Sequence, residues 1–520
     1  MKNDIAMETK YIKLAFAATL AVVGLASCSL DYEPLSNASE ITQGSYVDTT
    51  TLALKDKAAA ESQLKILYDK FRNRQEHRHL DLILVGDALA DNAYGGTVDG
   101  GVVDFEENSI DQSNPNLKRD WDRYLTDIGV ANKLVVGSKQ LFEKGMISEG
   151  DYNSLRAQGE IFRALQMFPM VRLFGSFPLI TTIGQTITSD NIDEVWPTYY
   201  PKQSTTLECF EQIIKDLEDG EKYAPDFNIG DRTLMTKTVA QAFLAKAYAE
   251  LAWLEPEKKA ENYQKVIEYA EKVRNTAGLT LEPDFRTLWS YNSATQDVVK
   301  RNTSESILEV QWQKGNGNWE SWMYTNPLDN PGESFTWAKW ITPSRDLVNA
   351  FEKEGDTLRY HQTVAWMACT WSNYYPASNY AFMNKLRAKV CNEYVARLAD
   401  IILLEAESYA NTGNLQKATE LVNMIRQRAK LSNLTAAQTS SQQAMLDAVL
   451  NERRLELALE GERWFDLRRY GKVEEVMNGL DNRDSGRHKQ VRTFTKNSYN
   501  LPIPQTAIDQ NPNLVQNPGY

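Results

Sequence analysis

Two parts of this 520-residue chain repeat one helical design. Residues 238–253 form an alanine-rich amphipathic pattern, which is followed after the Pro256 turn by a second helical pattern at 263–273. Residues 393–409 and 415–430 repeat this order around a glycine-containing turn. Small residues allow two helices to approach closely, and neither hairpin can bury its apolar face alone. The pattern therefore predicts helical hairpins that stack on one another.

Each hairpin resembles the tetratricopeptide unit, in which two antiparallel helices pack against their neighbours. Apolar residues at helical spacing predict further helices at 58–71, 117–141, 152–174 and 444–470. Pro169 lies inside the third of these and is expected to kink or interrupt it. The predicted fold class is mostly α, a tetratricopeptide-like scaffold with irregular, aromatic-rich insertions.

Residues 276–384 interrupt the helical pattern. This zone is rich in Trp, Tyr, Asn, Gly and Pro, and it contains one strand-like piece at 306–313. Irregular segments on a rigid scaffold are where binding residues are usually displayed. We therefore expect an insertion that carries ligand-binding side chains.

A secretory leader is expected at residues 1–27, where lysines precede an apolar run too short to cross a bilayer. The small residues before Cys28 resemble the lipobox of bacterial lipoproteins, whose cysteine is lipidated. We expect a lipidated tether over 28–50 and a single domain over 51–520. The alternative is an ordinary signal peptide with an incidental cysteine.

The charge balance argues against nucleic acid as a partner. The formal net charge is -13 and the isoelectric point is near 5.1, which disfavours capture of phosphates. The remaining cysteines, Cys209, Cys369 and Cys391, are odd in number and lack metal-ligand spacing. These residues are expected to be buried thiols.

No catalytic or cofactor pattern stands out. His77 and His79 lack a third histidine or a cysteine spaced for zinc, and they are expected to be solvated. No nucleophile-elbow or nucleotide-loop glycine pattern occurs. Counting carboxylates leaves a glycosidase pair open, because the chain is acidic throughout. We predict a protein that is not an enzyme and has no cofactor. The sequence assigns no metal site and leaves open whether an ion is bound.

Residues 451–469 carry an unusual density of charges among apolar residues. Glu452, Glu456 and Glu460 fall on one helical face and would repel one another unless arginines neutralise them. A structural ion-pair network is therefore expected. This segment resembles the C-terminal region of the SusD/RagB family of Bacteroidetes outer-membrane lipoproteins. Four further segments match the same family in the right order, at 163–180, 397–428, 499–504 and 511–520.

The resemblance implies a function as well as a fold. Members of the family sit on the cell surface as lids over a SusC-like, TonB-dependent transporter, bind an oligosaccharide or a peptide, and pass it to the barrel. They have no catalytic activity. Their ligand sites lie largely outside the tetratricopeptide-like units, which agrees with the position of the aromatic insertion.

Sugar binding needs flat apolar rings beside amide, carboxylate or guanidinium groups. Trp319, Trp322, Trp337 and Asn318 supply this chemistry within the insertion, and the first two are expected to be exposed beside flexible glycines. A second candidate is the glycine-rich loop that follows Asp91, which would project the side chains of Asn92 and Tyr94. The group Trp371, Tyr374 and Tyr375 could serve as core or as a partner interface.

Three functions remain open at this stage. The first is a surface glycan-binding lipoprotein that works with a transporter. The second is a peptide-binding, RagB-like version, which would depend more on main-chain pairing than on stacked rings. The third is an adhesive repeat protein, because tetratricopeptide scaffolds mostly bind proteins. The tryptophan-rich insertion favours the glycan.

Overall fold

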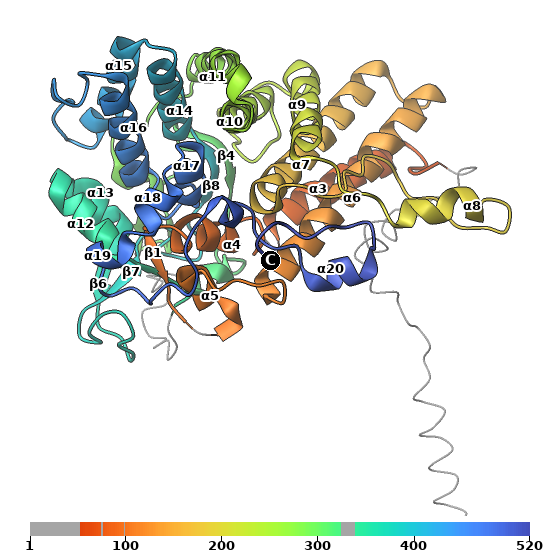
Figure 1. The fold of residues 1–520 in the computed structure, drawn as a ribbon. Coiled ribbons are helices and arrows are strands. Elements are labelled where there is room, and N and C mark those ends of the chain that lie inside the picture. The colour runs from red at the N-terminus through yellow and green to blue at the C-terminus, as the bar shows by residue number, and fades with distance from the viewer. Residues whose placement is uncertain (1–51, 74–75, 98, 324–338) are drawn as a thin grey trace, which may run out of the picture.

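The computed structural model describes residues 52–73, 76–97, 99–323 and 339–520. Helix makes up 54% of it and strand 7%, which confirms the mostly α class. The helical hairpins follow one another in an arc, and a loop-rich part with short strands lies below one end of the arc (Figure 1). This division places the irregular segments together on one side of the scaffold.

The scaffold helices pack in chain order. These helices are α3 (Lys57–Arg72), α6 (Pro115–Glu143), α7 (Glu149–Phe174), α9 (Thr206–Tyr223), α10 (Lys237–Leu254), α11 (Lys259–Arg274), α14 (Leu398–Asn411), α15 (Leu415–Arg428) and α16 (Gln442–Glu456). Neighbours pack from α6 through α7, α9, α10, α11 and α14 to α15 and α16. This order is consistent with tetratricopeptide-like hairpins.

Most of the predicted helices are confirmed within a few residues of their expected ends. Helix α9 was not predicted, although its start carries a capping box in which Thr205 and Glu208 bond reciprocally. Helix α7 continues through Pro169 to Phe174, so the expected interruption is wrong. Residues 157–174 are buried, and this packing supports the helix where proline removes one backbone hydrogen bond.

The predicted helix over 444–470 is wrong, because it is two helices. Helix α16 ends at Glu456, and α17 (Arg463–Arg469) begins after a turn in which Leu459 and Gly461 have φ of 61° and 83°. The backbone N–H groups of Leu459 and Gly461 donate to the buried Asp87 carboxylate at 3.1 and 2.8 Å. A contact with a residue distant in the sequence therefore interrupts the helix that the apolar periodicity predicts.

The helix predicted at 393–409 starts late. Its first residues form β8 (Glu393–Arg397), which pairs antiparallel with β4 (Ser306–Val310) in a register that joins Val310 to Glu393. Helix α14 then follows directly from the strand. The strand expected at 306–313 is confirmed as β4, and β8 is the partner that sequence periodicity missed.

Short elements make up the loop-rich part. The other two-stranded sheets among the described residues are β1 (Ala93–Gly95) with β5 (Ile341–Pro343), β2 (Tyr291–Asn292) with β3 (Asp297–Val298), and β6 (Val364–Met367) with β7 (Tyr380–Met383). Its helices include α4 (Leu80–Ile83), η1 (Leu84–Ala88), η2 (Asp99–Gly101), α5 (Val103–Glu107), η5 (Phe285–Trp289), η6 (Trp319–Met323), α12 (Arg345–Glu354) and α13 (Thr357–Thr363).

The remaining short helices connect the scaffold and finish the chain. They are α8 (Ile192–Val195), η3 (Trp196–Tyr199), η4 (Pro256–Lys258), α18 (Val473–Met477), α19 (Leu480–Arg483), η7 (Lys496–Ser498) and α20 (Gln505–Gln510). The final segment packs on the end of α7, where Leu501 N–H donates to the Leu173 carbonyl at 2.8 Å and Asn517 Nδ2 to the Phe174 carbonyl at 2.9 Å. Segments more than 300 residues apart thus close the fold together.

The ion-pair network predicted around Glu452, Glu456 and Glu460 is confirmed. Arg359 lies 2.7 Å from Glu452 and 3.0 Å from Glu456, and Arg397 lies 2.5 Å from Glu456 and 2.7 Å from Glu460. Burial alone would raise the pKa of Glu456, but the surrounding arginines hold it well below its usual range. The network joins α13, β8, α15 and α16, with Arg428 of α15 also paired to Glu456.

Candidate functional site

Among the described residues of the insertion, the short helix η6 carries the most exposed aromatic side chain. Trp319 is 46% exposed, which is unusual for a large indole ring. Trp322, one helical turn later, is partly buried, and Lys389 Nζ lies 3.5 Å from the centroid of its ring. The exposure expected for Trp319 is therefore confirmed, whereas Trp322 shows only part of its surface.

Two glycines shape the segment that leads into η6. Gly315 has φ of 85°, a conformation that favours glycine, in a turn that a hydrogen bond from Asn316 N–H to the Gln313 carbonyl closes at 3.0 Å. Gly317 lies directly against Lys389, and a Cβ atom at this position would lie 2.6 Å from the Lys389 Cβ. The tight approach brings Trp319 beside the 389–390 segment.

A hollow of about 370 Å³ opens beside the two rings. It is lined by Gln296, Gln313, Lys314, Gly315, Gly317, Trp319, Trp322, Lys389 and Val390. Side-chain amides and ammonium groups can donate to hydroxyl or carboxylate oxygens, while an indole face covers apolar C–H surface. Sequence reasoning missed Gln296, Lys314 and Lys389, because only the fold brings them to the tryptophans.

Asn318 is predicted to contact the ligand, but its side chain is buried and does not line the hollow. Its side chain is 2% exposed and donates to the Glu393 carboxylate, while its Oδ1 accepts from Glu320 N–H at 2.8 Å. These bonds start η6 and tie it to β8. Asn318 therefore positions Trp319.

The loop that was expected to project Asn92 and Tyr94 is also buried. Tyr94 is 0% exposed and lies in β1, where its hydroxyl donates to Asp484 and its ring stacks on Tyr374 with centroids 4.3 Å apart. Asn92 is 1% exposed and donates to Asp87 at 2.8 Å. Both side chains are satisfied inside the protein and leave no surface for a ligand.

Two further predicted residues, Cys28 and Trp337, lie outside the described residues. The third aromatic group was left open between core and interface. Tyr374 and Tyr375 are each 6% exposed and pack with Tyr94 and Tyr380 in a small apolar cluster. Tyr374 and Tyr375 therefore belong to the core of the loop-rich part, and the partly buried Trp371 packs against their cluster.

The histidines expected to be solvated are enclosed. The side chain of His77 is 3% exposed and that of His79 is 14% exposed. His77 Nε2 lies 3.3 Å from Asp127, and His79 Nδ1 lies 3.4 Å from Glu320. Burial raises the pKa of Glu320 to about 7, and the charge of Glu393 adds to the rise although His79 opposes it.

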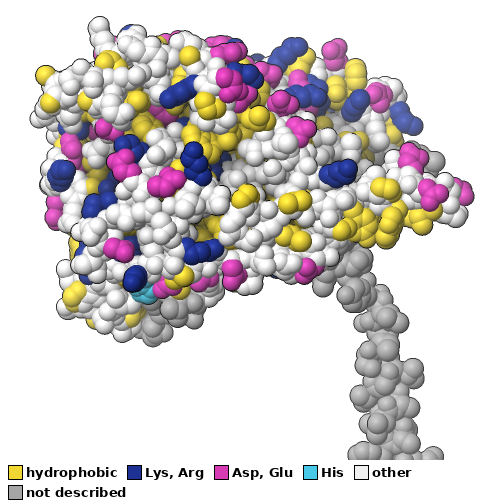
Figure 2. Space-filling view, in the orientation of Figure 1, with side chains coloured by type: hydrophobic (Ala, Val, Ile, Leu, Met, Phe, Trp, Pro, Cys, Tyr) yellow, Lys and Arg dark blue, Asp and Glu magenta, His cyan; other side chains and the backbone are white. Residues whose placement is uncertain are grey.

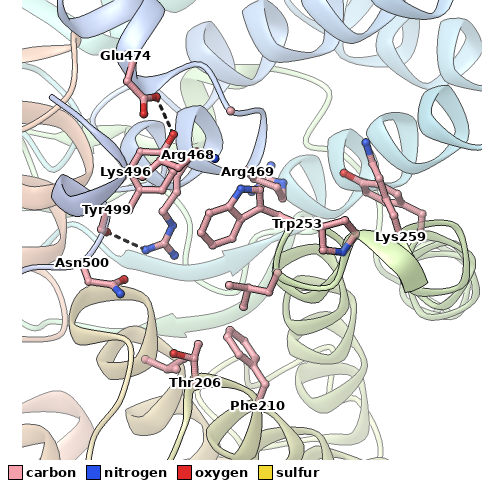
Figure 3. Close-up of a pocket in the computed structure, with 16 residues that line it drawn as sticks. Thr206, Phe210, Trp253, Lys259, Arg468, Arg469, Glu474, Lys496, Tyr499 and Asn500 are labelled. Atoms are coloured by element: carbon pink, nitrogen blue, oxygen red, sulfur yellow. Dashed lines mark hydrogen bonds between the residues drawn. The ribbon is translucent and has the colours of Figure 1, made fainter. Parts of the chain in front are cut away.

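A larger groove of about 860 Å³ lies elsewhere, between the scaffold and the final segment (Figure 3). Its walls include Phe210 from α9, Trp253 from α10, and Arg468, Glu474 and Tyr499 from the last 60 residues. The Arg468 guanidinium lies 5.3 Å from the centroid of the Trp253 ring, and Figure 3 shows the two side chains beside each other. The ring is partly buried, and no prediction from the sequence pointed to this groove.

Most polar groups of the groove already have partners. Arg468 donates to the Arg172 and Tyr499 carbonyls at 2.6 and 3.2 Å and to Glu250. The Tyr499 hydroxyl donates to Glu474 at 2.7 Å. The ring of this groove, Trp253, is only partly exposed, whereas Trp319 is 46% exposed, so the hollow beside Trp319 is the better candidate site.

Exposed apolar side chains also gather over α8 and η3, which project from the scaffold (Figure 2). Trp196 there is 50% exposed and Ile192 is 46% exposed. Trp196 is not among the residues that line the hollow beside Trp319. In the described part of the chain, every helix is too short or too polar to cross a membrane.

The helical hairpins pack in chain order, as in helical-repeat proteins, and the insertion carries an aromatic platform made of the exposed Trp319 and its neighbour Trp322. Two family models match the chain, the SusD family over residues 384–520 and "Starch-binding associating with outer membrane" over residues 50–249. The chain belongs to the SusD family.

Relatives are similar over most of their length. SusD-like protein P2 of Formosa agariphila is 26% identical over 475 residues, covering 85% of this chain and 88% of the relative. A SusD-like protein of Bacteroides ovatus is 25% identical over 497 residues, covering 88% and 82%.

Solved structures share the fold. A SusD superfamily protein of Bacteroides vulgatus has a TM-score of 0.70 at 21% identity, covering 90% of this chain and all of that one (100%). A laminarin-binding SusD-like protein has a TM-score of 0.68 at 23% identity, with coverage of 90% and 100%. A surface glycan-binding protein A of Bacteroides fluxus has a TM-score of 0.70 at 18% identity, with coverage of 89% and 99%.

Proposed function

We propose that this chain is a glycan-binding protein of the cell surface, without catalytic activity, and that it captures an oligosaccharide at the hollow beside Trp319. The observation that carries the proposal is the 46% exposed indole at the rim of a hollow with amides and lysines. The indole face would cover the C–H surface of a sugar ring, and the polar groups would bind its hydroxyls.

The names of similar proteins support a carbohydrate ligand. One matching family model is described as starch-binding, and one structure with the same fold is described as laminarin-binding. A peptide ligand would depend on pairing with a strand edge, whereas this hollow is lined by rings and side-chain amides. These observations favour a glycan over a peptide and over an adhesive role.

The proposal extends to the cellular setting. A lipid on Cys28 would hold the protein at the outer membrane, and a SusC-like TonB-dependent transporter would receive the captured oligosaccharide. The match to a family model described as associating with the outer membrane supports this setting. The tether would keep the protein close to its transporter and raise their effective concentration.

The test is calorimetric titration of the purified protein against a panel of plant, host and microbial oligosaccharides. For a glycan that binds, Trp319→Ala is expected to raise Kd by about 30-fold, corresponding to about 2 kcal/mol for a central aromatic contact. Trp322→Ala should weaken binding less, because much of that ring is already covered by Lys389.

The matched control is Trp196→Ala, because Trp196 is 50% exposed and lies on η3, away from the hollow. This variant should bind with unchanged Kd. Wild-type affinity in both the Trp319→Ala and the Trp322→Ala variant would refute the proposed site.

A further inference from the structure

Three ionisable side chains meet directly behind the exposed Trp319. His79 comes from the turn before α4, Glu320 from η6 and Glu393 from β8. One ligand atom of each lies within 4.8 Å of the other two. Their side chains are 14%, 1% and 0% exposed, so the cluster is closed off from bulk water.

Glu320 is the unusual member of this cluster. Neither oxygen of its buried carboxylate accepts a hydrogen bond from the described part of the chain. His79 Nδ1 lies 3.4 Å from Glu320 Oε2, beyond the usual length of a nitrogen-to-oxygen hydrogen bond. A buried carboxylate left in this way is costly, and a bound cation would supply the missing partner.

Glu393 is held as metal-ligating carboxylates are usually held. Its Oε1 accepts from Trp312 Nε1 at 3.0 Å and from the Asn318 amide, and Arg78 lies 3.0 Å from Oε2. Hydrogen bonds of this kind orient a carboxylate before a metal arrives. Arg78 balances one carboxylate charge, and the second carboxylate remains for a cation.

The spacing of the donor atoms suits a small divalent metal. His79 Nδ1 lies 3.4 Å from Glu320 Oε2 and 3.9 Å from Glu393 Oε1. Zinc bound to nitrogen and oxygen at about 2.0–2.2 Å in a tetrahedron separates its ligands by about 3.4 Å. One imidazole with two carboxylates suits zinc, whereas calcium and magnesium prefer oxygen ligands alone.

We propose that His79, Glu320 and Glu393 bind one zinc ion, which fastens η6 to β8 and to the turn before α4. Glu320 follows Trp319 directly in the chain, so the ion would hold the base of the aromatic platform. The site stands apart from glycan binding, because it requires no ligand in the hollow. Sequence spacing did not point to this site, because the fold brings together residues that are far apart in the chain.

The experiment uses metal-free full-length protein, prepared with a chelator and given zinc alone. Elemental analysis after gel filtration should find about one zinc per chain, because three protein ligands and a water complete the coordination. Cobalt in place of zinc should give the visible absorption of a tetrahedral site. No glycan is present, so failure here leaves the proposed function untouched.

Two variants and one control locate the ion. Glu320→Gln keeps the side-chain shape and His79→Ala removes the imidazole, and each should raise the zinc Kd at least about 100-fold, since each deletes a direct ligand. His361→Ala removes an exposed histidine and should leave Kd unchanged. Circular dichroism confirms that each variant is folded.

The proposal fails if the wild-type protein retains no zinc, or if Glu320→Gln and His79→Ala both bind zinc as the wild type does. It also fails if calcium or magnesium displaces zinc at equal concentration, because the nitrogen ligand would then play no part. Since the wild-type measurement needs no variant, it decides the proposal even if one variant does not fold.

Discussion

The C-terminal ion-pair network and the Trp319 platform both stand out in the sequence, but the fold buries the network and exposes the Trp319 ring. Glu456 is 0% exposed and lies among Arg359, Arg397 and Arg428, all of them buried. Trp319 is 46% exposed at the rim of a hollow. The conspicuous charges build the scaffold, and a single ring on a short helix faces solvent.

The difference follows from the cost of burial. A buried charge must be answered by partners with good geometry, so each charged residue of the network restricts several helices at once. An exposed aromatic ring carries no buried charge that needs a partner, and a turn held by buried contacts can present it to solvent. A dense cluster of charges therefore indicates structure here, whereas an exposed ring indicates a binding surface only where, as at Trp319, a hollow lies beside it.

The largest expected effect comes from breaking the network. Glu456→Gln removes one charge and leaves Arg359, Arg397 and Arg428 partly uncompensated in the interior. We expect the free energy of unfolding to fall by about 3–5 kcal/mol, as when one partner of a buried ion pair is lost. Urea denaturation followed by circular dichroism measures the change.

The control for this variant is Glu420→Gln. Glu420 also pairs with a cation, Lys417 at 3.0 Å, but its side chain is 49% exposed. Solvent screens this pair, so the free energy of unfolding should fall far less than in the Glu456→Gln variant. Equal losses in the two variants would mean that burial does not distinguish the network from surface charge.

Helices of the scaffold could be predicted from the sequence, because their periodicity reports local amphipathicity. Helices α10 and α15 match the predicted segments closely. The break between α16 and α17 could not be predicted, because it depends on Asp87, more than 370 residues earlier in the chain. Strand β8 was likewise hidden, since it exists only through pairing with β4.

Only part of the candidate site could be predicted, because some of its features are local in the sequence and others depend on distant contacts. Gly315 and Gly317 marked a turn that presents Trp319, which is a local property. Tyr94 has similar glycine neighbours, yet its environment is set by Asp484, 390 residues away. Local composition indicated that a loop was present, and distant partners decided which ring it would expose.

An intermediate effect is expected at Tyr94. Its hydroxyl lies 2.8 and 2.7 Å from the two oxygens of Asp484 and accepts from Arg345 N–H at 2.9 Å. Tyr94→Phe removes a hydrogen bond to a buried carboxylate, so the free energy of unfolding should fall by about 1.5–3 kcal/mol. Chemical denaturation measures the loss, and calorimetry should find glycan affinity unchanged.

The comparison for this variant is Tyr199→Phe on the projecting η3, whose hydroxyl donates to the Gln185 carbonyl in an exposed setting. A change within about 0.5 kcal/mol is expected there, because water replaces an exposed partner. If Tyr94→Phe weakened glycan binding without loss of stability, Tyr94 would be part of the ligand site after all.

The smallest effect on the folded domain is expected from Cys28→Ala, which changes neither the network nor the platform. The free energies of unfolding and of glycan binding should stay within about 0.5 kcal/mol of wild type, because Cys28 precedes the domain predicted over 51–520. Surface retention should nevertheless be lost, because the acyl chains of a lipidated cysteine supply the membrane affinity. Fractionation of cells with an antibody to the domain measures retention, and wild-type retention would show that Cys28 is no anchor. The Cys28→Ala variant would thus change only where the protein is located, whereas changes in the scaffold alter stability and changes in the platform alter glycan binding.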